Sequence, residues 1–210
     1  MNHTFEFSAR IATFASALSL TVFVVACGHD SPIGPPTPSG ATVLGGPPMT
    51  SAPPPPPGWK PQPVVPTSQQ QAQDTILGYL KKTLQALPPG TTLNASGFGG
   101  ATNTPPCKDQ VNGTPSIALT TVGQLKLPSG TDVGALIATT ADIWKSWGWY
   151  VMERDGFRKP NQFGYAADGY SLQIFIAAHE GHGPTLAATS PCFPANLPSD
   201  RSPFPTILGP

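Results

Sequence analysis

Two histidines three positions apart are the residues whose types and spacing most directly suggest chemistry. His179 and His182 belong to the stretch HEGHG, in which Glu180 is the only nearby acidic residue. Zinc proteases place two histidines four positions apart on a helix, with a glutamate beside the first. Here the spacing is three and glycines interrupt the stretch, so the pattern favours an exposed turn. Adventitious metal binding and a metal-dependent hydrolase are the alternatives.

A group of aromatic residues is the second feature that could serve a function. On a concave face, aromatic rings stack on glycans or line a lipid pocket. The alternative, which the pattern favours, is that these rings belong to the core and its edge. The candidate ligand-binding residues are Trp144, Trp147, Trp149, Tyr165 and Tyr170.

The stretch RDGFRK places Arg154, Arg158 and Lys159 around one predicted loop. Such a loop could contact an anionic headgroup or a wall polymer, but we expect a solvated loop. The chain has no serine nucleophile elbow, no phosphate-cradling glycine loop and no CxxC pair. Its carboxylates show no spacing typical of acid–base catalysis. We therefore predict no enzyme, and no catalytic residue, metal or cofactor.

The three cysteines indicate where the protein is located. An odd cysteine in a secreted protein needs an explanation. If Cys27 carries a lipid, Cys107 and Cys192 remain, and export would place them in an oxidising compartment where a disulfide persists. Two buried free thiols are the alternative.

The apolar run before Cys27 is too short and too polar for a membrane span, which needs roughly 20 mostly apolar residues. It fits the hydrophobic region of a secretory signal, with Arg10 as its positive flank. Its end, Val24-Val25-Ala26-Cys27, resembles a bacterial lipobox. The resemblance implies a lipoprotein signal peptide over 1–26 and acyl chains such as palmitate on Cys27, which would retain the protein at the membrane. An ordinary signal peptide or an uncleaved anchor is the alternative.

Composition separates a tether from a domain. The segment from Gly28 to Ser68 holds half of the 28 prolines and few large apolar residues. We therefore expect 27–67 to be a disordered tether, partly in polyproline II conformation. A docking site for a proline-binding partner is the alternative. Charged residues make up only 10% of the chain and the net charge is zero, so nothing indicates nucleic-acid binding.

From Ser68 the pattern is that of a folded domain, predicted over 68–205. We expect a helix over 68–87, which begins with a capping box of Ser68 and Gln71, and a second over 131–148 with Thr131 as N-cap. The expected strands are 91–95, 116–127, 149–155, 169–178 and 184–193. This order predicts an α+β fold, with an antiparallel sheet of about four to five strands and two helices packed on one face.

The lipobox, the Pro-rich tether and the two-cysteine domain together resemble the small lipoproteins of mycobacteria and related actinobacteria. The stretches ERDGFRKPNQFGYAADGYSL and SPCFP support this resemblance. It implies a protein of the cell envelope and no catalytic residues. We expect a lipid-anchored module on the extracytoplasmic face of the cell membrane that binds a lipid, a glycan or a small ligand. A scaffold that docks another envelope protein, through a sheet edge or the 156–169 loop, is the alternative.

Overall fold

The computed structural model describes residues 53–98, 102–179 and 181–210. Contacts divide the chain into the units Met1–Asp30 and Ser31–Pro210, and every described residue belongs to the second unit. The predicted signal peptide, Cys27 and the tether before Pro53 lie outside the described residues. None of the helices in the described part of the chain is long and apolar enough to cross a membrane.

Helix α1 (Gln69–Ala86) begins where the sequence predicts. The Ser68 side chain accepts a hydrogen bond from the backbone N–H of Gln71 at 3.0 Å, which satisfies one of the free donors at a helix start. The Gln71 side chain binds the backbone N–H of Thr67 at 2.7 Å. The helix ends before Pro88, because proline disfavours helical geometry in the residue that precedes it.

Helix α2 (Val133–Ser146) starts one residue later than predicted, because Asp132 is the N-cap in place of Thr131. The Asp132 carboxylate accepts from the backbone N–H of Ala135 at 3.0 Å. The Thr131 hydroxyl donates to the Pro128 carbonyl at 2.7 Å instead, so it takes part in the preceding turn. A carboxylate also interacts favourably with the positive end of the helix dipole.

The strands form one large sheet and one small one. The order in the large sheet is β10-β1-β4-β8-β7-β6-β5, with β2 also paired to β4, and β3 pairs with β9 in a separate ribbon. All recorded pairings are antiparallel. The strands are β1 (Thr92–Asn94), β2 (Thr102–Asn103), β3 (Ser116–Ile117), β4 (Thr120–Lys126), β5 (Tyr150–Met152), β6 (Asn161–Tyr165), β7 (Ser171–Phe175), β8 (Thr185–Thr189), β9 (Phe193–Pro194) and β10 (Ile207–Leu208).

The α+β class is confirmed, but the predicted sheet of four to five strands was too small. Strand β6 lies inside the region expected to be a loop, and β10 lies beyond the predicted domain end at 205. Four strands contain only two residues each, β2, β3, β9 and β10. Two residues show no periodicity, so these strands exist through pairing with chain neighbours that are distant in sequence.

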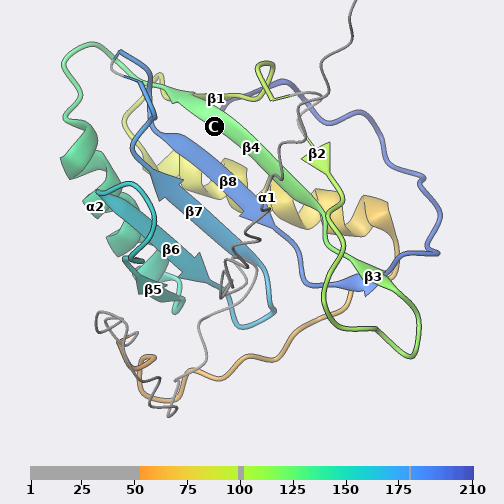
Figure 1. Ribbon diagram of the computed structural model, residues 1–210. Helices are drawn as coiled ribbons and strands as arrows, with labels where there is room; N and C mark the ends of the chain where they lie inside the picture. Colours follow the sequence, from red (N-terminus) through yellow and green to blue (C-terminus); the bar gives the residue numbers. More distant parts are fainter. Residues whose placement is uncertain (1–52, 99–101, 180) are drawn as a thin grey trace, which may run out of the picture. The chain divides into compact units, whose positions relative to one another are not determined.

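Both helices pack on one face of the large sheet and lie behind it in Figure 1. The core between the helices and the sheet contains Ile76 and Leu80 from α1, Ile137 and Trp144 from α2, and strand residues such as Leu172. We call this side of the sheet the helix face and the other side the open face. Side chains alternate between the two faces along each strand.

The segment before α1 contacts the sheet, although the sequence assigned it to the tether. The backbone N–H of Gln62 donates to the Ala167 carbonyl at 2.6 Å, and that of Val64 to the Asp168 carbonyl at 2.9 Å. Trp59 packs on the Tyr150 ring, with 5.3 Å between centroids. The described part of this proline-rich segment is therefore held against the turn between β6 and β7 and against β5.

The predicted disulfide between Cys107 and Cys192 is present. It joins the segment after β2 to the segment between β8 and β9. The backbone N–H of Cys107 also donates to the Ser116 carbonyl at 2.8 Å. The cross-link therefore fastens the short β3–β9 ribbon beside the large sheet.

Candidate functional site

Four of the five predicted aromatic residues come together on the helix face. Trp144, Trp149 and Tyr170 are buried in the core cluster, and Trp147 packs against it. The centroids of the Trp144 and Trp149 rings lie 6.2 Å apart, and those of the Trp147 and Trp149 rings 5.4 Å apart. Tyr79 of α1, which the sequence did not single out, contacts Trp149 edge-on at 4.9 Å.

Two polar side-chain atoms of this aromatic group, on Trp144 and Tyr79, already have partners. The Trp144 indole N–H donates to the Thr83 hydroxyl at 3.2 Å, and the Tyr79 hydroxyl donates to the Asp168 carboxylate at 2.6 Å. Burial and the hydrogen bond to Asp168 raise the pKa of Tyr79 well above its ordinary value. The Lys82 ammonium lies 4.1 Å from the Trp147 ring centroid. The group therefore packs as a self-contained part of the core.

Tyr165 is separated from the other four predicted residues, because it points to the open face. It lies opposite Tyr150 on β5 and opposite Ser171 on β7. Tyr150, Met152, Phe163 and Tyr165 form a second buried cluster, against which Trp59 packs. The open face thus has an apolar cluster of its own near β5, and no helix contributes to it.

Arg154 lies in this second cluster and is only 7% exposed. One guanidinium nitrogen, Nη1, donates to the Tyr165 hydroxyl at 3.1 Å. The guanidinium carbon is 5.6 Å from the Phe157 ring centroid and 5.3 Å from that of Phe163. The Asn161 side chain accepts from the backbone N–H of Arg154 and donates to its carbonyl. These two hydrogen bonds hold the Arg154 backbone in place. We call Arg154, Tyr165, Phe157, Phe163 and Trp59 the arginine cluster.

Two buried polar atoms at the arginine cluster have no hydrogen-bond partner among the described residues, the Trp59 Nε1 within the cluster and the Ser171 Oγ beside it. Ser171 is Tyr165's neighbour across β6 and β7, and Trp59 packs on Tyr150 on the other side. A buried polar atom without a partner is costly, by about 1–3 kcal/mol. Such atoms in a folded protein therefore call for an explanation.

The two histidines lie close together, and the described part of the chain brings no third metal ligand to them. The ring centroids of His179 and His182 are 6.0 Å apart, and both residues are exposed. Within the described ranges, no group of three or more histidine, cysteine, aspartate or glutamate residues is placed to hold a metal ion. Glu180 lies outside the described residues.

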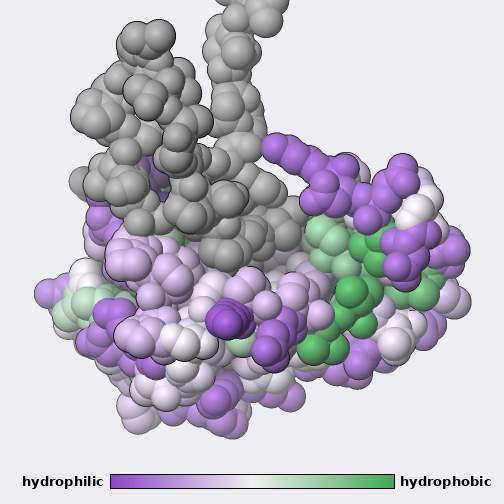
Figure 2. Space-filling view, turned by 90° about the horizontal axis from the view of Figure 1, so that it is seen from below, coloured by the Kyte–Doolittle hydropathy of each residue, from purple (hydrophilic) through white to green (hydrophobic). Residues whose placement is uncertain are grey.

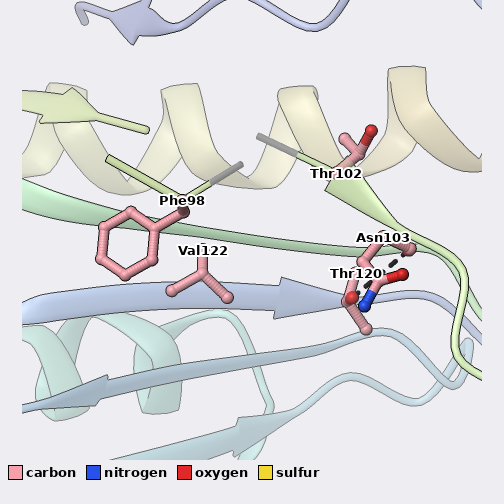
Figure 3. A pocket seen from close by; sticks show the side chains of 5 residues that line it. All are labelled: Phe98, Thr102, Asn103, Thr120 and Val122. Atoms are coloured by element: carbon pink, nitrogen blue, oxygen red, sulfur yellow. Dashed lines mark hydrogen bonds between the residues drawn. The ribbon is translucent and has the colours of Figure 1, made fainter. Parts of the chain in front are cut away.

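Two shallow depressions lie near the other end of the sheet. The smaller, of about 190 Å³, is bordered by Phe98, Val122 and Thr120 together with Thr102 and Asn103. Figure 3 shows Phe98 and Val122 at one end of it, and the hydrogen bond from Thr120 to the Asn103 carbonyl at the other. The larger, of about 610 Å³, lies between the ends of β1 and β4 and the loop that contains His182. Neither one borders the arginine cluster.

The chain matches no family model, no curated protein and no solved structure. The site must therefore be judged from its own residues.

The arginine cluster was not predicted from the sequence, in which Arg154 was expected in a solvated loop. One signal was available, since Tyr150, Met152 and Arg154 continue the two-residue period of a strand and so point to one face. Trp59 gave no such signal, because it lies in a stretch whose composition predicts a tether.

Proposed function

We propose that the protein is a lipid-anchored, non-catalytic module that binds a ligand at the open face of its sheet, on the extracytoplasmic side of a cell membrane. The observation that supports binding is the pair of buried, unpartnered polar atoms in and beside the arginine cluster, at Trp59 and Ser171. The aromatic group on the helix face is less suited to a ligand, because its indole and phenol donors at Trp144 and Tyr79 already have acceptors.

The disulfide supports export. Disulfides persist in oxidising compartments and are rare in the cytosol. With Cys107 and Cys192 joined, Cys27 is the third and remaining cysteine of the sequence. Its position at the end of a lipobox-like stretch makes acylation the most economical explanation for it, and two or more acyl chains give stable membrane retention.

The anchoring part of this proposal is tested by Cys27→Ala in the full chain, expressed in a bacterium that processes lipoproteins. We expect the variant to leave the membrane fraction or to accumulate as an unprocessed precursor, while the parent chain stays with the membrane. Cys107→Ala is a matched control, because it removes a cysteine without touching the lipobox. Unchanged processing and membrane retention in Cys27→Ala would contradict lipid anchoring.

The binding part is tested by native mass spectrometry of the full chain, purified in a mild non-ionic detergent. We expect an additional mass that is neither lipid anchor nor detergent. We expect Trp59→Phe to reduce it, because this change removes the indole N–H while it keeps an aromatic ring. Trp147→Phe is the matched control on the helix face and should retain the mass. A chain without any additional mass would count against a binding module.

One observation favours a scaffold as a second candidate. Ile207 on β10 is 62% exposed at an edge of the large sheet, and an unpaired edge is a common template for strand addition by a partner. Most of the described surface seen in Figure 2 is hydrophilic or weakly polar, with one hydrophobic group at its right side. Crosslinking of the protein to a partner in cells would test this candidate. A crosslink that is lost in Ile207→Lys and kept in the control Val64→Lys would favour it.

A further inference from the structure

The charge of Arg154 is not neutralised by its neighbours in sequence. Glu153 and Asp155 flank it, but both carboxylates bind the Lys159 ammonium, at 2.7 and 2.9 Å. Among the described residues, no carboxylate lies within ion-pair distance of the Arg154 guanidinium. In the described part of the chain, the side-chain hydrogen-bond partner of this guanidinium is the Tyr165 hydroxyl.

Tyr165 does not supply the missing negative charge. Burial raises the pKa of its phenol, and the nearby positive charge of Arg154 lowers that pKa by less. The phenol is therefore neutral at physiological pH, and it contributes a dipole only. The Phe157 and Phe163 rings stabilise the guanidinium through cation–π contacts.

Burying a cation without a counter-ion costs several kcal/mol even after relaxation of the surroundings. An arginine is suited to such a position when it binds an oxyanion, because its planar guanidinium donates two parallel hydrogen bonds to a carboxylate or a phosphate. The Trp59 indole N–H is a donor only. The Ser171 hydroxyl can donate or accept. The Trp59 indole and the Ser171 hydroxyl are therefore two unpartnered groups that can donate to an oxyanion.

We propose that Arg154, Trp59 and Ser171 recognise the anionic group of a ligand, a carboxylate or a phosphate, at the open face of the sheet. This inference rests on the proposed binding function and names the chemical class of its ligand. Phe157, which is 36% exposed at the edge of the cluster, extends the site with an apolar surface. The apolar part of an anionic ligand would lie against this ring.

The test observes the Trp59 indole N–H by ¹⁵N nuclear magnetic resonance in the full chain, in non-ionic detergent. Its signal is assigned as the one that Trp59→Phe removes. Sodium phosphate, sodium acetate and octyl phosphate are titrated at constant ionic strength, with sodium chloride as control. We expect a saturable shift with an oxyanion and none with chloride. A shift with phosphate but not with acetate indicates a phosphate ligand, and a shift with acetate but not with phosphate indicates a carboxylate. Tighter binding of octyl phosphate than of phosphate indicates a lipid-like source.

Three variants make the assignment specific. Arg154→Lys should weaken binding of the responding anion by about tenfold, because a point charge replaces a bidentate fork. Arg158→Lys is the same change in the same loop at an exposed residue, and it should leave binding unchanged. If Arg154→Lys fails to fold, Ser171→Ala decides, because its hydroxyl has no partner in the free protein and its loss leaves the fold intact.

The two proposals fail in different ways. A native mass that shows a neutral bound molecule, with no oxyanion response at Trp59, overturns the anionic site and leaves the binding module standing. Equal anion affinity in the parent chain and in both Arg154→Lys and Ser171→Ala also overturns the site. Absence of both a bound mass and an oxyanion response overturns both proposals.

Discussion

The two faces of the large sheet treat their aromatic and polar residues differently. On the helix face, the Trp144 indole and the Tyr79 phenol donate to Thr83 and Asp168. On the open face, the Trp59 indole and the Ser171 hydroxyl have no partner among the described residues. The helix face also holds one buried atom without a partner in the described ranges, the Gln73 Oε1 of α1. The indole of Trp144 and the phenol of Tyr79 are therefore satisfied, whereas an indole and a hydroxyl on the open face, beside a buried arginine, are not. Residue type alone does not distinguish them, because tryptophan and tyrosine occur on both.

The largest expected difference between the faces is in packing. Trp144 on the helix face is fully buried, and Trp144→Ala should lower the free energy of unfolding by about 3–5 kcal/mol, since it leaves a large cavity. Phe175 on the open face is half-buried, so Phe175→Ala should cost only about 1 kcal/mol. Urea denaturation of both variants checks this prediction, and similar losses would remove the distinction.

Gly164 tests how tightly the helix face is packed. A Cβ at this residue would lie 2.7 Å from Trp144 Cε3 and 3.0 Å from Trp149 Cε3, so Gly164→Ala should cost about 1–3 kcal/mol by displacing a ring. Gly78→Ala is the control, because Gly78 lies on α1 with no atom within 4 Å of the added carbon. Gly78→Ala should raise the free energy of unfolding by up to about 1 kcal/mol, because alanine has a higher helix propensity than glycine. Thermal unfolding distinguishes the two signs.

The Tyr79–Asp168 hydrogen bond on the helix face makes stability depend on alkaline pH. Because the pKa of Tyr79 is raised above 10 in the folded state, its contribution is complete below pH 10 and is lost as pH rises through the folded-state pKa. Tyr79→Phe should cost about 1–2 kcal/mol at neutral pH. Above pH 10, the stability of the Tyr79→Phe variant should fall less steeply with pH than that of the parent chain, by about 1.4 kcal/mol per pH unit. Urea midpoints measured across this range check the slope, and parallel slopes in both chains would contradict the pKa shift.

The smallest expected effect compares one buried hydroxyl from each face. Thr83 accepts from Trp144 and donates to the Tyr79 carbonyl, so Thr83→Val should cost about 1–2 kcal/mol by leaving the indole unpartnered. Ser171→Ala removes a hydroxyl that has no partner, and it should change stability by about 0.5 kcal/mol or less. Differential scanning calorimetry of the two variants provides the measurement. A large loss in Ser171→Ala would show that this hydroxyl is part of the core.

The sequence predicted the helices better than the sheet. The capping role of Ser68 and the apolar stripe of α1 are local patterns, so they were visible without the fold. At α2 the choice between Thr131 and Asp132 depended on the turn at Pro128, which takes the threonine hydroxyl. The two-residue strands β2 and β10 lie outside every predicted strand, because two residues carry no periodic pattern and the hydrogen bonds of β10 join it to a segment far away in the chain.

The candidate site shows the same division between local and long-range information. The sequence by itself determined that Cys107 and Cys192 could pair and that aromatic residues gather in the second half of the chain. Its two-residue period also places Tyr150, Met152 and Arg154 on one face of a strand. Only the tertiary structure decided that Arg154 is buried and which rings surround it. The reason is that Phe163 and Tyr165 of β6 reach this arginine from a separate strand, and burial is a property of that assembly rather than of any one stretch.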